Sequence, residues 1–228
     1  MPRSSSLRLE DLAGFRQAAY RVFGAVFLYP SQERIKNLAH AARELERQSR
    51  PLVGFAFFPE WQKFLSTLAG RGDSATADLE KDYLRLFVVN QEVPPYESSF
   101  LAPGNPALTM AALDGEYGAG GFSMAASFSE PPDHAAVELE FMSLLCEQEG
   151  EAWAKRSVTD ALRHLESEAG FLDRHLSRWF LLFTEQVGNR AGDSFYTSVT
   201  RAAHSFIEHD RALLSAFLEQ YRQEAVHG

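Results

Sequence analysis

The stretch FLDRHLSRWFLLFTEQV, at residues 171–187, decides the fold class of this chain. Its large apolar residues recur at spacings of three and four, which is the period of an α-helix. These residues are Leu172, Leu176, Trp179, Phe183 and Val187. Charged residues interrupt the stretch, so it falls short of the roughly 18–20 apolar residues that a membrane helix needs. The pattern predicts a four-turn helix with one face in a core, and no stable membrane insertion.

The same period recurs along most of the chain. One stripe runs from Leu12 to Val26 and must end before Pro30. Others lie between Phe195 and Phe206 and between Leu213 and Tyr221. The only short β-like run, at residues 86–89, ends a helical pattern. We therefore predict an all-α protein, a single helical bundle of about nine to ten helices.

Two stretches break the helical pattern. Residues 88–106 hold four prolines and are expected to form a long ordered loop. Residues 118–132, GAGGFSMAASFSEPP, are typical of a flexible hinge. This predicts an N-terminal helical set at 1–117, a hinge loop at 118–132 and a C-terminal helical set at 133–228. A hinge there would allow two copies to exchange one set and form a homodimer.

Charge is distributed unevenly. The chain has 228 residues and a net charge of −9, which argues against nucleic acid as a partner. From Leu86 to Ala154 there is no lysine or arginine, and the same stretch holds eleven acidic residues. This acidic third is either a solvated face or a surface for a basic partner.

The expected location is the cytoplasm. A single cysteine, Cys146, forbids an internal disulfide and fits a reducing compartment. The start, MPRSSSLRLEDL, has neither an apolar segment nor a cleavage site typical of a secretory signal. Because Cys146 falls within an apolar helical pattern, we expect its thiol to be packed rather than reactive.

The densest polar cluster is EPPDHAAVELEF, at residues 130–141. Asp133 is expected to cap a helix on which His134 and Glu138 share one face. These side chains either make local hydrogen bonds or, with a ligand from elsewhere, hold a metal. The second alternative would make the chain a small helical metal-binding protein or enzyme. Known nucleophile and phosphate-loop motifs are absent from the sequence, so a binding protein is favoured.

Two further features of the sequence are the segments DYLRLFVVNQEVPPYESSFL at 82–101 and EPPDHAAVELEFMSLL at 130–145. Together they resemble the paired signature motifs of the TorD/DmsD/NarJ family of cytoplasmic chaperones, which help molybdenum-containing redox enzymes to mature. The matching residues of the first are Tyr83, Leu86, Phe87, Pro95, Tyr96, Glu97 and Ser98. Those of the second include Glu130, Pro131, Asp133, His134 and Glu138. Residues 88–93 depart from the family pattern and leave the client open.

The resemblance implies a chaperone without catalysis that binds the precursor of a molybdopterin-containing oxidoreductase catalytic subunit. It implies recognition of a twin-arginine signal peptide, in which the second motif takes part, and export only after cofactor loading. The acidic third would suit the paired arginines, and a groove lined by Tyr83, Phe87, Tyr96 and Phe100 would suit the apolar part of the signal. No resident cofactor is expected, and transient contact with molybdenum cofactor or guanine nucleotide is left open.

Overall fold

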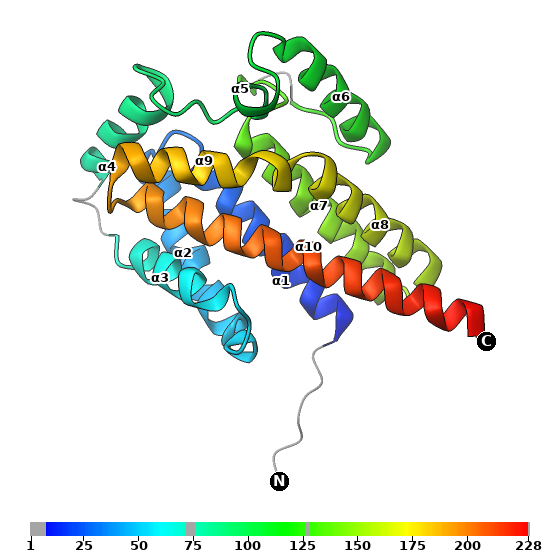
Figure 1. The fold of residues 1–228 in the computed structure, drawn as a ribbon. Coiled ribbons are helices and arrows are strands. Elements are labelled where there is room, and N and C mark those ends of the chain that lie inside the picture. The colour runs from blue at the N-terminus through cyan, green and yellow to red at the C-terminus, as the bar shows by residue number, and fades with distance from the viewer. Residues whose placement is uncertain (1–7, 72–75, 126–127, 228) are drawn as a thin grey trace.

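The structure, a computed structural model, describes residues 8–71, 76–125 and 128–227. Ten α-helices account for most of them (Figure 1). The first half of the chain contains α1 (Leu9–Val26), α2 (Gln32–Gln48), α3 (Phe58–Ala69), α4 (Thr76–Tyr83), α5 (Glu97–Leu101) and α6 (Pro106–Ala119). The second half contains α7 (Ala135–Ala154), α8 (Val158–Arg174), α9 (Leu176–Ala191) and α10 (Phe195–His227). The all-α prediction is confirmed over the described ranges.

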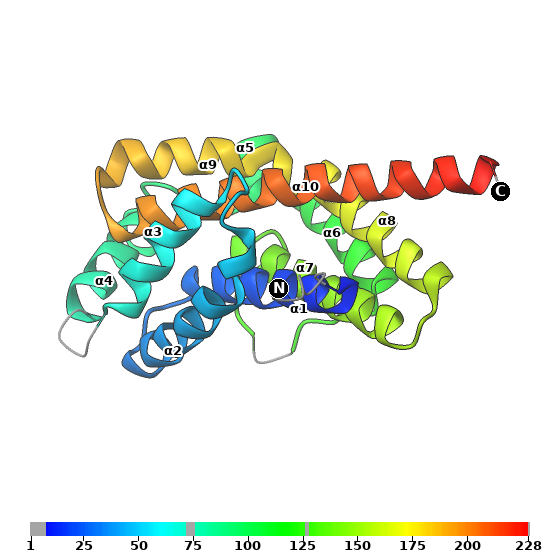
Figure 2. The ribbon, with the colours of Figure 1, turned by 90° about the horizontal axis from the view of Figure 1, so that it is seen from below.

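The helices α1 and α7 lie side by side at the centre of the bundle, and α10 runs along a face of the molecule beside α9 (Figures 1 and 2). Their apolar stripes meet in one core that includes Phe23 of α1, Phe141 of α7, Trp179 of α9 and Phe206 of α10. The core is thus continuous across the two predicted helical sets. The division of the chain into these two sets stays a prediction. None of the described helices is both long and apolar enough to cross a membrane.

The helix expected over residues 171–187 is broken. The helix α8 ends at Arg174 and α9 begins at Leu176, because His175 has φ −123° and ψ −93°. The expected apolar residues on both sides of the break are still buried. The sequence pattern therefore located the buried face correctly and missed the change of direction.

The segment between α4 and α6 is more helical than expected. After α4 the chain widens into a π-helical turn at Leu84–Val88, a form often found at functional positions. The stretch predicted as a loop contains the five-residue helix α5. Both features lie within the first signature motif.

Candidate functional site

The two signature motifs pair through their backbones. The amide of Glu97 donates to the carbonyl of Asp133 at 2.9 Å, and that of Ala135 donates to the carbonyl of Pro95 at 2.8 Å. Tyr96 and His134 form the isolated antiparallel bridge between these contacts. Segments distant in the sequence therefore form one unit at the start of α7.

Asp133 caps a different helix from the one expected. Its carboxylate accepts a hydrogen bond from the backbone amide of Ser98, at 3.2 Å, in the first turn of α5. The α5 N-cap residue, Tyr96, provides no side-chain bond of its own. Asp133 thus satisfies an amide that the short helix would otherwise leave without a partner. The prediction that Asp133 caps the following helix was wrong, because that helix begins two residues later, at Ala135.

His134 is the N-cap of α7. Its Nδ1 accepts a hydrogen bond from the amide of Ala136 at 3.0 Å, so this nitrogen is unprotonated. Burial lowers the pKa of His134 to about 4. Its Nε2 lies 3.8 Å from a carboxylate oxygen of Glu130. The local hydrogen bond of His134 is therefore made with the backbone of its own helix rather than with Glu138.

Glu138 is fully buried and faces α9. Its Oε2 accepts a hydrogen bond from the indole of Trp179 at 3.1 Å. Burial, followed by the negative charge of Glu97, raises the pKa of Glu138 well above its usual range. Through the bond to Trp179, Glu138 ties the second motif to α9.

His175 joins the first motif to the break between α8 and α9. Its Nδ1 lies 2.8 Å from Oε2 of Glu97, and both side chains are buried. Sequence reasoning missed this residue, although a titratable side chain inside an apolar stripe was a usable signal. We call the following set of buried residues the motif hub: Glu97, Asp133, His134, Glu138, His175 and Trp179.

Two aromatic residues of the first motif, Tyr83 and Phe87, belong to the core. The ring of Phe87 packs on Phe27, Phe183 and Tyr196. The Tyr83 hydroxyl donates to the carbonyl of Phe27 at 3.3 Å, and burial raises the pKa of Tyr83 to about 12. These rings therefore do not form the expected open groove.

The remaining motif residues divide into buried and accessible ones. Leu86, Pro95 and Ser98 are buried, so their side chains support the site from within. Tyr96, Glu130 and Pro131 are partly exposed. Their contribution to binding stays a prediction, and they are the motif residues that a partner reaches most easily.

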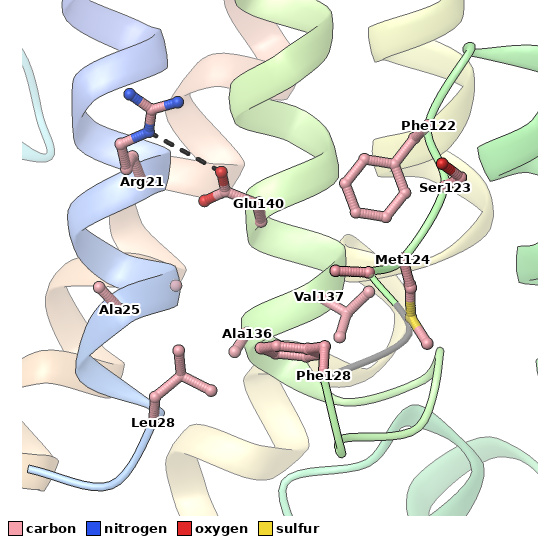
Figure 3. Close-up of a pocket in the computed structure, with 12 residues that line it drawn as sticks. Arg21, Ala25, Leu28, Phe122, Ser123, Met124, Phe128, Ala136, Val137 and Glu140 are labelled. Atoms are coloured by element: carbon pink, nitrogen blue, oxygen red, sulfur yellow. Dashed lines mark ion pairs between the residues drawn. The ribbon is translucent and has the colours of Figure 1, made fainter.

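An open apolar pocket lies beside the motif hub, between α1, α7 and the segment formed by residues 122–125 and 128 (Figure 3). Its volume is about 480 Å³. Apolar side chains from three elements line it: Ala25, Leu28, Phe122, Met124, Phe128 and Val137. Arg21 of α1 and Glu140 of α7 form an ion pair at one end, 3.8 Å apart. Sequence reasoning assigned this segment to a hinge and did not predict the pocket.

Contacts hold the segment between α6 and α7 in place. The hydroxyl of Tyr117 donates to the carbonyl of Pro132 at 2.7 Å. The ring of Phe122 packs on Tyr117 and Phe141. These anchors place one side of the expected hinge against the core, and residues 126–127 lie outside the described part.

The described ranges contain no set of ligands for the metal site that the sequence left open as an alternative. No group of three His, Cys, Asp or Glu side chains there could hold a metal ion. The Nδ1 of His134 is already occupied by a backbone amide. Cys146 is buried, as expected.

Comparison with known proteins gives consistent matches. The sequence model described as nitrate reductase delta subunit matches residues 56–185. The chain is 27% identical over 217 residues to the chaperone protein TorD of Vibrio cholerae, covering 92% of this chain and 86% of that protein. It is 28% identical over 134 residues to the perchlorate reductase assembly chaperone protein of Dechloromonas aromatica, covering 58% and 59%.

A crystal structure from Archaeoglobus fulgidus, described as that of a redox enzyme maturation protein, shares the fold. Its TM-score is 0.51 at 24% identity, over 84% of this chain and 93% of that one. The two relatives are named as chaperones, which agrees with a binding role rather than catalysis. The chain belongs to the nitrate reductase delta subunit family, the TorD/DmsD/NarJ group that its paired motifs resemble.

Proposed function

We propose that this protein is a cytoplasmic chaperone that binds the precursor of a molybdopterin-containing oxidoreductase catalytic subunit and holds it until its cofactor is inserted. Membership of the family supports this proposal, as does the likeness to a perchlorate reductase assembly chaperone. The precursor is engaged through its twin-arginine signal peptide, its apo subunit or both. Binding would delay export until the client is loaded.

The observation that carries the proposal is the junction of the two motifs beside an open apolar pocket. The hub fixes the start of α7, and α7 supplies Val137 and Glu140 to the pocket. The hub also fixes the backbone that carries Tyr96 and Glu130. The motif residues would thus act mainly as supports for a binding surface.

The energies of such binding favour an apolar contact. Two arginines in exposed ion pairs supply roughly 0.4–2 kcal/mol together, whereas micromolar affinity needs about 8 kcal/mol. Burial of about 300 Å² of apolar surface supplies roughly 7 kcal/mol before ordering costs. A chaperone for a twin-arginine peptide therefore needs an apolar pocket as well as acidic groups.

The test is co-expression of the tagged chain with each candidate catalytic subunit, in three forms: precursor, subunit without its signal peptide, and cofactor-loaded enzyme. We expect the precursor to co-purify and the loaded enzyme to be released. Equal retention of the loaded enzyme would indicate a permanent subunit. No association with any molybdopterin subunit, together with stoichiometric bound metal by elemental analysis, would favour the metal-protein alternative.

A homodimer formed by exchange of helical sets remains part of this proposal. The connection between α6 and α7 is where the exchange would occur. Size-exclusion chromatography over a range of concentrations should show two species that interconvert after partial denaturation. A single monomeric species throughout would contradict it.

A further inference from the structure

The pocket between α1 and α7 is accessible, whereas Asp133 and His134 of the second motif are buried. Asp133 and His134 are only 2% and 1% exposed, but Phe128 at the pocket is 38% exposed. We propose that this pocket, rather than the motif residues, receives an apolar segment of the client, and that Glu140 at its rim selects a positively charged residue beside that segment. This inference rests on the proposed client binding and specifies its site.

The walls of the pocket suit apolar side chains. Apart from Arg21, Ser123 and Glu140, the residues that line it are apolar or glycine. Its volume of about 480 Å³ lies within the range of about 300–1,000 Å³ that is usual for binding pockets. Met124 forms part of one wall, and the unbranched thioether side chain adapts to different apolar partners.

Charge around the pocket indicates where a client cation would lie. On the side of α1 the pocket carries one positive charge, that of Arg21, which also lines a neighbouring hollow with Glu33 and Arg34. The side of α7 is acidic, because Glu140 and Glu147 are spaced seven residues apart and share one helix face. A segment with a basic residue would therefore place it beside α7.

Arg21 competes with the client for Glu140. The two side chains approach to 3.8 Å, with 58% and 44% of their surfaces exposed (Figure 3). Such an exposed pair is weak and easily exchanged for another cation. Arg21 thus reduces binding of basic segments, and only those with an adequate apolar anchor would dock.

The test uses a fluorescein-labelled peptide with two adjacent arginines followed by a leucine-rich segment, titrated by anisotropy against the full chain. Ala25→Phe should fill the pocket and weaken binding at least about tenfold, because it displaces a buried apolar side chain of the peptide. Ala18→Phe is the matched control, since Ala18 lies two turns earlier on α1 at a different hollow. Thermal melts establish that each variant is folded.

The proposed attraction between Glu140 and a client cation is tested with substitutions of exposed residues, which should leave the protein folded. Glu140→Gln should weaken binding about 2–5-fold and Arg21→Gln should strengthen it by a similar factor. Glu151→Gln is the control, because that exposed residue of α7 pairs with Lys155. Replacing the peptide arginines by glutamine should abolish the effect of Glu140→Gln, and raising the salt concentration should reduce it.

Four outcomes distinguish a failure of the proposed pocket from a failure of the proposed function. The changes above in affinity support the pocket. Unchanged affinity in both Ala25→Phe and Glu140→Gln, with wild-type binding intact, overturns the pocket and leaves the chaperone function standing. Binding of the precursor without binding of the peptide also overturns it. Failure to bind either the peptide or any precursor overturns the proposed function itself.

Discussion

Two buried polar clusters lie in this molecule, and they balance their charges differently. In the arginine cluster, Arg16 of α1 donates hydrogen bonds to Glu149 at 2.6 Å, to Asp210 at 2.5 Å and to Glu168. The motif hub also buries three carboxyl groups, those of Glu97, Asp133 and Glu138, but has no arginine or lysine. Its carboxyl groups interact instead with one backbone amide, one indole and one imidazole.

This difference indicates that the arginine cluster stabilises the fold, whereas the motif hub supports the binding site. The arginine cluster joins four helices, α1, α7, α8 and α10, and the hydroxyl of Tyr20 adds a bond to Asp210 at 2.7 Å. A buried guanidinium that bonds to three carboxyl groups is costly to remove. The hub joins the starts of α5 and α7 to α9 and to the break between α8 and α9 through single buried hydrogen bonds. We therefore expect substitutions in the first cluster to affect stability and substitutions in the second to affect mainly the shape of the site.

The largest expected effect comes from Arg16→Met. Three buried acids would lose their common cation, which should reduce the free energy of unfolding by about 3–5 kcal/mol. Urea denaturation followed by circular dichroism measures it. Arg21→Gln on the same helix is the control, because an exposed side chain of this kind should change stability by less than about 0.5 kcal/mol. Equal stability of the two variants would contradict a structural role for the arginine cluster.

The next effect is a loss of stability as pH rises from about 4.5 to about 8. Burial, which outweighs the attraction of Arg16, raises the pKa of Glu168 to about 8 from an ordinary 4.5. The native state therefore binds more protons than the unfolded state between these values, and stability falls as pH rises through that window. Because the shift exceeds one unit, melting temperature should fall by at least about 3 °C. Glu168→Gln should flatten this slope, and a wild-type slope that persists in the variant would contradict the assignment.

His134 in the motif hub should have the opposite effect to Glu168, because it makes stability rise with pH. Burial lowers its pKa to about 4 from 6.5, so the unfolded state binds more protons between these values. The stabilisation is complete above pH 6.5 and is lost as pH falls toward 4. His134→Asn keeps an acceptor for the amide of Ala136 and should remove this acid sensitivity. Melting curves of both proteins from pH 4 to 8 measure it, and parallel curves would refute the prediction.

The two clusters also show which features of the molecule could be predicted from the sequence and which could not. The apolar period fixed the fold class, and residues 171–187 were assigned the correct buried face. The bend at His175 was not predictable from that period, since both helices keep the same apolar residues in the core. The partners of Arg16 come from helices more than 130 residues away, and spacing carries no signal for such contacts. The motif residues were found by resemblance, but resemblance did not indicate that most of them are buried.

The smallest expected effect distinguishes the corrected role of Asp133 from the predicted one. Asp133→Ala removes the acceptor for the amide of Ser98 and should cost about 1 kcal/mol of stability, whereas Asp133→Asn keeps an acceptor and should cost only a few tenths. Hydrogen exchange should then locate the loss at α5 and leave the first turn of α7, which His134 caps, protected as in the wild type. Because the carboxylate is 2% exposed, Asp133→Asn should also leave peptide affinity within about twofold. A large loss of affinity with unchanged melting temperature would instead assign the charge of Asp133 to the client, and would return the binding surface from the pocket to the second motif.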